Sequence, residues 1–331
     1  MRVSTIHVRA LVEAVEATGR SASPLLARVG LAPTTIAEPY GFIEEAQLDA
    51  LAEAAIEELG DPAFGLRWGE SSPMMRYDLM AMMAGAYAPT LRASLECLLR
   101  FQPMLAERPE LELVESGETA TLRFTPVGGS DVGRRVRSEV AMAGFVRFLR
   151  YAAPGGDVIR RVDFEYPKPE HAAEYLRFFG DRASFARPFT GLVLSREALD
   201  RALPQCNPEL HDALVAQAEQ VLARIVRGLT YGDRLRRQMS ATFPDLPSIT
   251  LAARSFGVSE RSLRRRLAEE GSSYSRIVQE ARCLVAQRLL LDATRSVQEV
   301  AFASGFESST AFHRAFKRWT GKSPQEFRTS A

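Results

Sequence analysis

One helix–turn–helix pattern occurs twice in the last hundred residues of this chain, and the repeat constrains the fold more than any other feature. The small and glycine positions recur at a separation of 48 residues, which pairs Ser248 with Ser296, Ala253 with Ala301 and Gly257 with Gly305. Beyond the glycine the separation is 49 residues, which pairs Leu263 with Phe312, Leu267 with Phe316 and Arg265 with Arg314. Because small, apolar and basic positions keep one register together, the sequence predicts a duplicated structural unit.

Each copy has the residues of two short helices joined by a tight turn. A small residue four positions before a glycine lets two helices cross closely, and the glycine permits the turn between them. A Ser or Glu two positions after the glycine is expected to start the second helix. In the first copy Leu263 and Leu267 then face inward, while Arg261, Arg264 and Arg265 share the outer face.

The segment between the two copies, residues 275–291, is predicted to form one continuous helix. Seventeen residues at about 1.5 Å each span roughly 25 Å. With side chains and flanking loops, a rod of this length places two recognition helices near the ~34 Å repeat of one DNA turn. We therefore expect one chain to read two successive major-groove segments of double-stranded DNA.

The C-terminal part of the chain resembles the AraC/XylS family of bacterial transcription regulators. The resemblance lies in the two motifs, the linking helix and the closing stretch from Gly305 to Arg328, which has at its centre Phe312-His-Arg-Ala-Phe-Lys-Arg-Trp-Thr-Gly-Lys-Ser-Pro324. The resemblance covers residues 235–329, and its small departures are Ala252 and Glu307. It implies an operator-binding regulator, with RNA polymerase as a candidate further partner. The expected DNA-binding residues are Arg261, Ser262, Arg264, Arg265, Ser309, Thr310, His313, Arg314 and Lys317.

Not every arginine in the recognition helices is expected to contact a base. Arginines on a helix face are commonly only solvated, and Arg266 lies towards the flank. Arg314 is equally compatible with a base contact and with a phosphate contact. The two matched copies and the charge of this region together favour DNA binding over solvated charge.

The two parts of the chain differ in charge. Residues 231–331 contain 17 Lys or Arg and 10 Asp or Glu, whereas residues 1–230 contain 25 and 31. The basic part is suited to phosphate contacts that weaken with salt. The acidic part is not expected to bind DNA.

Composition is typical of a soluble globular chain of two domains, since 46% of the 331 residues are hydrophobic and 25% are charged. No stretch approaches the ~20 apolar residues that cross a bilayer. Polar residues such as His7 and Glu13 interrupt the apolar positions at the N-terminus, unlike a signal peptide. Cys97, Cys206 and Cys283 are far apart in sequence, which favours a reducing compartment. We expect a cytoplasmic protein without membrane contacts.

The predicted fold is an α+β N-terminal sensor domain followed by an all-α double helix–turn–helix domain. Helices are predicted at 6–18, 24–29, 44–59, 76–88, 90–105, 130–151 and 169–179. Strands are predicted at 111–115, 119–125, 160–166, 184–186 and 191–195, the first two as a hairpin. The expected domains are residues 1–206 for effector binding or dimerisation, 207–232 as an amphipathic linker helix, and 233–331 for DNA binding.

The linker helix carries an apolar stripe formed by Leu210, Leu214, Val221 and Ile225. Asn207 and Pro208 are residues typical of a helix start. The stripe fits two arrangements, a two-helix seam of a homodimer or a helix packed on its own domain. The sequence leaves both open.

The N-terminal domain also resembles the arabinose-binding-like sensor domain of the family, which implies a small-molecule effector without implying a sugar. Candidate effector-binding residues are Met80, Met83, Tyr87 and Arg134. The methionines belong to a dense cluster that suits an irregular apolar cavity, although an ordinary core helix is the simpler explanation of it. The arginine belongs to a trio, Arg134, Arg135 and Arg137. This trio fits either the binding of an acidic group of a ligand or three charges that are simply solvated. Together they suggest an amphipathic organic or fatty acid.

Catalysis is the second hypothesis for the N-terminal domain. The four histidines and three cysteines are scattered without metal-ligand spacing, and no nucleotide-binding or hydrolase motif occurs. We therefore expect no catalytic residues, no metal and no cofactor. A constitutive regulator whose N-terminal domain only dimerises remains a further alternative, whereas a purely architectural DNA-binding protein fits poorly with so large an acidic domain.

Overall fold

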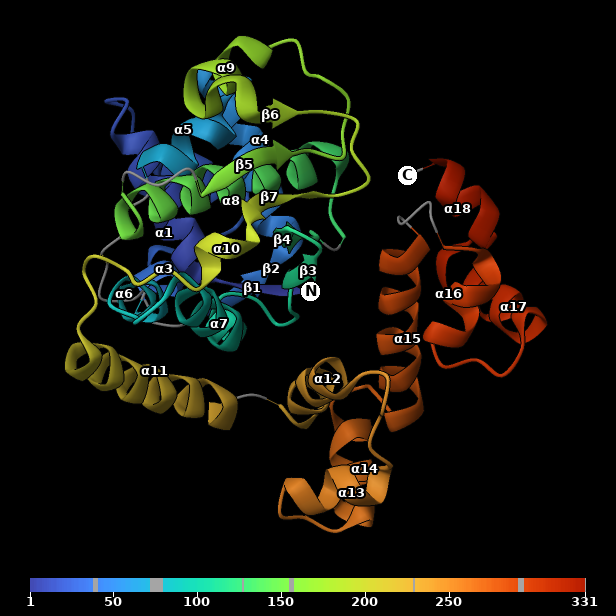
Figure 1. Cartoon of the computed structure of the whole chain (residues 1–331). Coiled ribbons are helices and arrows are strands. Elements are labelled where there is room, and N and C mark those ends of the chain that lie inside the picture. Colours follow the sequence, from blue (N-terminus) through green and yellow to red (C-terminus); the bar gives the residue numbers. More distant parts are fainter. Residues whose placement is uncertain are drawn as a thin grey trace. The chain divides into compact units, whose positions relative to one another are not determined.

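The chain divides into two compact units, Met1–Ile225 and Val226–Ala331, each with its own core. The computed structural model describes residues 1–37, 41–71, 80–126, 128–154, 158–228, 230–290 and 295–330 (Figure 1). The first unit mixes helices and strands and the second is helical, so the predicted fold class is confirmed.

A five-stranded sheet organises one half of the first unit (Figure 1). Its strands in spatial order are β3 (Leu111–Ser116), β4 (Thr119–Phe124), β7 (Thr190–Ser195), β5 (Ile159–Asp163) and β6 (Ala183–Ser184). All neighbours are antiparallel except β5 and β6. The predicted β3–β4 hairpin turns at Gly117, whose φ of +57° suits glycine.

Helices surround this sheet and build a second core beside it. They are α1 (Thr5–Glu16), α2 (Ser23–Arg28), α3 (Pro33–Ala37), α4 (Glu45–Leu59), α5 (Phe64–Ser71), α6 (Met80–Ala86), α7 (Leu91–Phe101), α8 (Asp131–Ala152), α9 (Ala172–Phe179) and α10 (Arg196–Leu199). The long helix α8 packs Met142, Val146 and Leu149 against the sheet. Its N-terminal half contributes Val136 to the core formed by α1, α2, α4 and α5.

Elements whose pairing partners lie far away in the sequence were not predicted. The strands β1 (Arg2–Ser4) and β2 (Phe42–Glu44) pair antiparallel, yet each has only three residues and no alternating pattern. The predicted helix at 90–105 ends at Phe101 and continues as a 3-10 turn at Gln102–Met104, which contains a proline. Of the predicted helix at 76–88, residues 76–79 lie outside the described part, and α6 ends at Ala86.

Two glycines permit the close crossing of α5 and α8. A Cβ atom on Gly69 would lie 2.6 Å from the Val140 carbonyl oxygen and 2.7 Å from the Ala143 Cβ. A Cβ on Gly65 would lie 3.2 Å from the Val136 carbonyl oxygen. The Val140 and Val136 oxygens belong to the α8 backbone, which cannot easily give way, so the crossing favours glycine at both positions and most strongly at Gly69.

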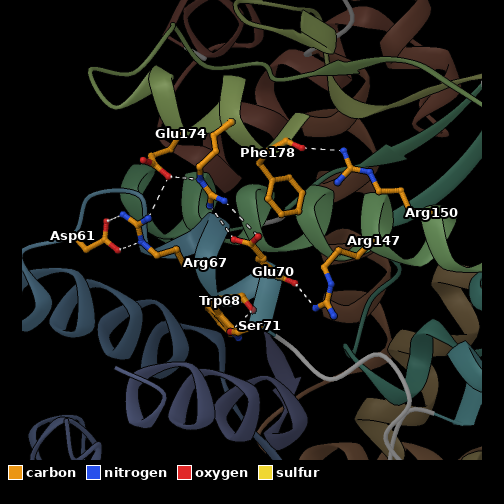
Figure 2. A network of polar contacts seen from close by, with 11 residues as sticks. Asp61, Arg67, Trp68, Glu70, Ser71, Arg147, Arg150, Glu174 and Phe178 are labelled. Atoms are coloured by element: carbon orange, nitrogen blue, oxygen red, sulfur yellow. Dashed lines mark hydrogen bonds and ion pairs between the residues drawn. The ribbon is translucent and has the colours of Figure 1, made fainter. Parts of the chain in front are cut away.

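Ion pairs fasten the outer side of α5 to α9 (Figure 2). Arg67 of α5 pairs with Asp61 at 2.7 Å and with Glu174 of α9 at 3.2 Å. Glu70 of α5 pairs with Arg177 of α9 at 2.9 Å. Half-exposed pairs of this kind are individually weak, and their contribution here is to the orientation of α9.

The helix α11 (Pro208–Gly228) packs on the first unit. Its buried residues Ala218, Val221 and Ile225 form one apolar cluster with residues of α6, α7 and the following turn, namely Ala84, Cys97, Phe101 and Met104. The His211 ring also bonds the Ala84 carbonyl oxygen at 2.8 Å. Of the apolar stripe, Val221 and Ile225 are buried in this cluster, Leu214 packs against it and Leu210 is exposed. The first compact unit ends at Ile225, within α11.

The second unit contains seven helices within its described residues (Figure 1). They are α12 (Tyr231–Thr242), α13 (Ile249–Ser255), α14 (Glu260–Glu269), α15 (Tyr274–Leu290), α16 (Val297–Ala303), α17 (Ser309–Thr320) and α18 (Pro324–Ser330). Two small cores hold them, and α15 belongs to both. Its residues Ile277 and Ala281 are buried with α12, α13 and α14, and Ala286 and Leu290 with α16 and α17.

Substitution of Gly69 by alanine is expected to destabilise the first unit by about 1–3 kcal/mol, because the new methyl group clashes with the α8 backbone. Gly144→Ala, on α8 itself, is the matched control, since a Cβ there meets nothing within 4 Å and alanine favours a helix. Urea denaturation gives the free energy of unfolding of both variants and of the wild type. Equal stability of the two variants would contradict the close crossing.

Candidate DNA-binding interface and ligand cavity

The helix α14 is built as an exposed recognition helix. Ser259 caps its first turn by accepting a hydrogen bond from the Ser262 amide at 3.1 Å. The inward face buries Leu263 and Leu267 completely. The outer face exposes three of the four predicted DNA-binding residues of this helix, Arg261, Arg264 and Arg265, while Ser262 is half-buried.

The helix α17 repeats this design with aromatic anchors. Phe312 and Phe316 are fully buried, at the positions equivalent to the two leucines of α14. Of the predicted residues Ser309, Thr310, His313, Arg314 and Lys317, the last four are exposed and Ser309 is half-buried.

The start of α17 corrects one detail of the sequence analysis. Its cap is Ser308, which accepts from the Ala311 amide at 3.3 Å, and not Glu307 two positions after the glycine. The extra residue in this turn is the physical basis of the change in repeat separation from 48 to 49 residues. In both copies the turn glycine has a positive φ, +67° at Gly257 and +78° at Gly305.

The outward arginines differ in how they are held. Arg264 pairs with Glu260 at 2.8 Å, and this bond holds the pKa of that carboxyl group below its usual value. Arg265 makes only a loose pair with Glu269 at 3.6 Å, with both side chains largely exposed. Among the described residues Arg261 and Arg314 have no acidic partner, so they can contact DNA without breaking an ion pair.

Arg266 makes a packing contact within the unit instead. Its guanidinium lies 4.5 Å from the centre of the Tyr231 ring, in a cation–π contact. Next to it, Glu270 accepts hydrogen bonds from the Tyr231 amide at 2.9 Å and the Gly232 amide at 2.7 Å. The end of α14 thus fastens the beginning of α12.

Side chains of α15 and α18 fix the second motif. The Arg282 guanidinium of α15 lies 5.5 Å from the Phe306 ring in the turn before α17. Arg328 of α18 donates to the Leu290 carbonyl oxygen at 3.1 Å and to the Arg295 carbonyl oxygen at 2.7 Å. The second motif is therefore anchored to the end of α15 through both packing and hydrogen bonds.

The first unit contains a half-open cavity of about 190 Å³. Its walls come from α1, α4, α5, α6, α8 and the segment that leads into the sheet. Most of the lining is apolar, with Trp68, Phe124 and Phe145 as its aromatic members. The polar members among the described residues are His7, Gln102, Glu110 and Arg137.

Arg137 lies at the polar end of the cavity inside a cluster of carboxylates. It contacts Glu45 and Asp49 of α4, the latter at 3.2 Å, and Glu110 at 3.1 Å. All four side chains are at most 13% exposed. Burial raises the pKa of Glu45 and of Asp49, and the Arg137 charge opposes this rise in both.

His7 of α1 borders the same cavity in a neutral form. Burial lowers its pKa from 6.5 to about 4, and the nearby Arg137 charge lowers the pKa further, against a hydrogen bond to the Leu105 backbone. The ring keeps some accessible surface because it faces the cavity. At pH 7 it therefore offers hydrogen bonding without charge.

Three of the four effector-binding residues predicted from sequence do not line this cavity. Among the described lining residues, Met82 is present while Met83, Tyr87 and Arg134 are not, and the Met80 side chain lies outside the described part. The neighbouring Met74, Met75 and Tyr77 are also outside it. Arg134 is half-buried and pairs with Asp131.

The described ranges hold neither a candidate metal site nor a helix that could span a membrane. No group of three or more His, Cys, Asp or Glu side chains there is placed to hold a metal ion. No helix there has the length and apolar character needed to cross a bilayer.

Comparisons with known families match both units. The arabinose-binding N-terminal domain of the AraC transcription regulator matches residues 19–203, and a helix-turn-helix domain matches residues 252–330. The ornithine utilization regulator of Pseudomonas aeruginosa is 30% identical over 331 residues, covering 98% of this chain and 96% of that protein. The transcriptional regulator VirS of Mycobacterium tuberculosis is 25% identical over 317 residues, covering 94% and 91%.

Among solved structures, the transcriptional regulator CdpR from Pseudomonas aeruginosa is 24% identical. The match covers 93% of this chain and 96% of that chain, with a TM-score of 0.46.

The low pKa of His7 predicts an acid-sensitive first unit. The His7 ring has a pKa near 4 in the folded protein and near 6.5 in the unfolded chain. Below pH 6.5 the unfolded chain therefore binds the proton more tightly, and protonation lowers the free energy of unfolding. Stability should therefore fall as the pH drops from about 6.5 to about 4, with His7 contributing roughly 2–3 kcal/mol. Chemical denaturation of wild type and His7→Gln at several pH values measures this share. An identical pH dependence in both proteins would contradict the assignment.

Proposed function

The chain belongs to the AraC family of transcription regulators, and on that premise we propose that each subunit reads two successive major-groove segments of an operator under the control of a small molecule. The DNA-reading residues are those exposed on α14 and α17. The effector occupies the cavity of the first unit. We propose no catalytic role for that unit.

The observation that carries the DNA-binding proposal is the duplicated recognition surface. The equivalent residues Arg265 and Arg314 are both exposed, and the equivalent anchors behind them are both fully buried. The helix α15 shares its residues between the two cores, and its 17 residues span roughly 25 Å. This length supports two reading helices separated by about one turn of DNA.

The cavity supports ligand control over the alternative of an N-terminal domain that only dimerises. A half-open, mostly apolar space that also presents a few polar groups is typical of a small-molecule site. A name that refers to ornithine utilization, in one relative, supports a small metabolite as the effector. Such a ligand can act only by binding more tightly to one of two states of the regulator.

The same cavity gives little support to an enzymatic first unit. Arg137 and Glu110 are bonded to each other, and the Gln102 amide is used by the surrounding backbone. No nucleophile with an adjacent base lines it among the described residues. We further propose that the regulator is cytoplasmic, where it can reach operator DNA. We also propose that it acts as a homodimer.

Replacement of Arg261 or Arg314 by alanine is expected to weaken operator binding by about 1–3 kcal/mol if the residue contacts a base. Binding to random DNA should then change much less. Titrations of a selected operator and of random DNA, at several salt concentrations, measure both effects. An equal loss on both DNAs would identify a phosphate contact for that residue.

Arg224→Ala is the matched control, because it removes the same charge from an exposed position on α11 in the first unit. Its operator affinity should remain that of the wild type. The interface proposed on α14 and α17 would be contradicted if both recognition-helix variants also bound the operator with wild-type affinity.

A further inference from the structure

The charged side chains of the half-open cavity in the first unit are bonded to each other, and most of its walls are apolar. We propose that the ligand of this cavity is an uncharged, mainly apolar molecule the size of a substituted benzene ring. This inference rests on the proposed ligand control and specifies the chemistry of the ligand. It replaces the organic or fatty acid suggested by the sequence.

Two charged side chains, Glu110 and Arg137, border the cavity among its described lining residues. They are bonded to each other at 3.1 Å, and each is at most 13% exposed. Arg137 also contacts Glu45 and Asp49 of α4, and it donates to the Gly128 carbonyl oxygen at 3.0 Å. Groups of the unit itself therefore hold the guanidinium on several sides.

An ionised ligand gains little from this bonded pair. An anion would have to displace a carboxylate from Arg137, and a cation would have to share the Glu110 carboxylate with Arg137 or displace the arginine from it. Either ion would also lose its hydration among the apolar walls, and without a partner that loss is not offset. An uncharged molecule has neither cost, so the cavity selects against ionised ligands.

The other polar side chains of the described lining are neutral. Gln102 donates to the carbonyl oxygens of Leu99 and Leu111, and it accepts from two backbone amides. Burial lowers the pKa of His7 to about 4, so the ring is uncharged near pH 7, and it bonds the Leu105 backbone. Both side chains thus serve the backbone around the cavity, and neither offers a charge to a ligand.

The apolar walls set the size and shape of the ligand. An apolar protein cavity of about 150 Å³ binds benzene. The cavity here, at about 190 Å³, has room for a ring with a short substituent. Trp68, Phe124 and Phe145 provide flat surfaces for such a ring, and the flexible Met82 side chain can adapt to its outline.

Gly144 of α8 offers a way to fill this space without touching the charged pair. It lines the cavity, and a Cβ atom built on it would meet nothing within 4 Å. A long apolar side chain at this position can therefore extend into the volume that a ligand would occupy. Substitutions of Gly144 thus link the binding of a probe to this cavity.

Three probes with the same ring and different heads test the inference: 2-phenylethanol, 2-phenylethylamine and phenylacetate. At about pH 7 the amine is a cation, the carboxylate is an anion and the alcohol is uncharged. Each is titrated by calorimetry into the full-length protein, and operator affinity is measured with and without each probe. The alcohol should bind more tightly than either ion, by roughly tenfold or more, because only the ions must shed the hydration of a charge.

Gly144→Leu should abolish binding of the alcohol, because the leucine side chain takes up the space of the ring. Gly144→Ala is the matched control at the same position, since its single methyl group leaves most of the space open. It should retain most of the wild-type affinity for the alcohol. The ranking of the three probes in the wild type decides the charge of the ligand even if the leucine variant fails to fold.

Equal or tighter binding of either ion to the wild type, or no binding of any probe, would overturn the uncharged ligand. Unchanged binding of the alcohol to folded Gly144→Leu would overturn its assignment to this cavity. If an ion binds most tightly and changes operator affinity, ligand control stands while the uncharged ligand falls. If the alcohol binds with its predicted preference without changing operator affinity, the uncharged ligand stands and ligand control falls.

Discussion

The shared packing of α15 is the constraint on which the DNA-binding half depends. Each helix–turn–helix motif is too small to bury a large core of its own, so each completes its core with residues from one half of this helix. Ile277 and Ala281 serve the first motif, and Ala286 and Leu290 serve the second. Any sequence change that shortens or bends α15 therefore alters the stability of both motifs together with the separation of their recognition helices.

In the first unit, close packing and buried charge perform different tasks. The close crossing of α5 and α8 places Trp68 and Gly69 of α5 and Val140 and Gly144 of α8 in the lining of the cavity. The Arg137 cluster fixes the same helix to α4 at the polar end. A ligand bound between these helices thus touches the contacts that determine how they pack. That arrangement gives a small molecule a physical means of favouring one packing state of the unit.

The sequence predicted the features that follow from local pattern. The cap at Ser259, the buried pair Leu263 and Leu267, and the β3–β4 hairpin all appear where expected. The cavity was missed because its residues come from distant segments. His7, Trp68 and Arg137 meet only after three helices have packed, and no spacing in the chain indicates this. Arg266 is similar, since its partner Tyr231 is 35 residues away and belongs to another helix. The candidate effector residues came from a methionine cluster, and such residues serve cores and cavities alike.

The most direct test of the account is the footprint of the full-length protein on a selected operator. Hydroxyl-radical cleavage and base-methylation interference are measured together with the number of chains bound per DNA. The account predicts two protected major-groove segments for each chain, with centres about 10–10.5 base pairs apart. Protection of a single groove segment per chain would contradict the claim that α15 holds two recognition helices in phase with the duplex.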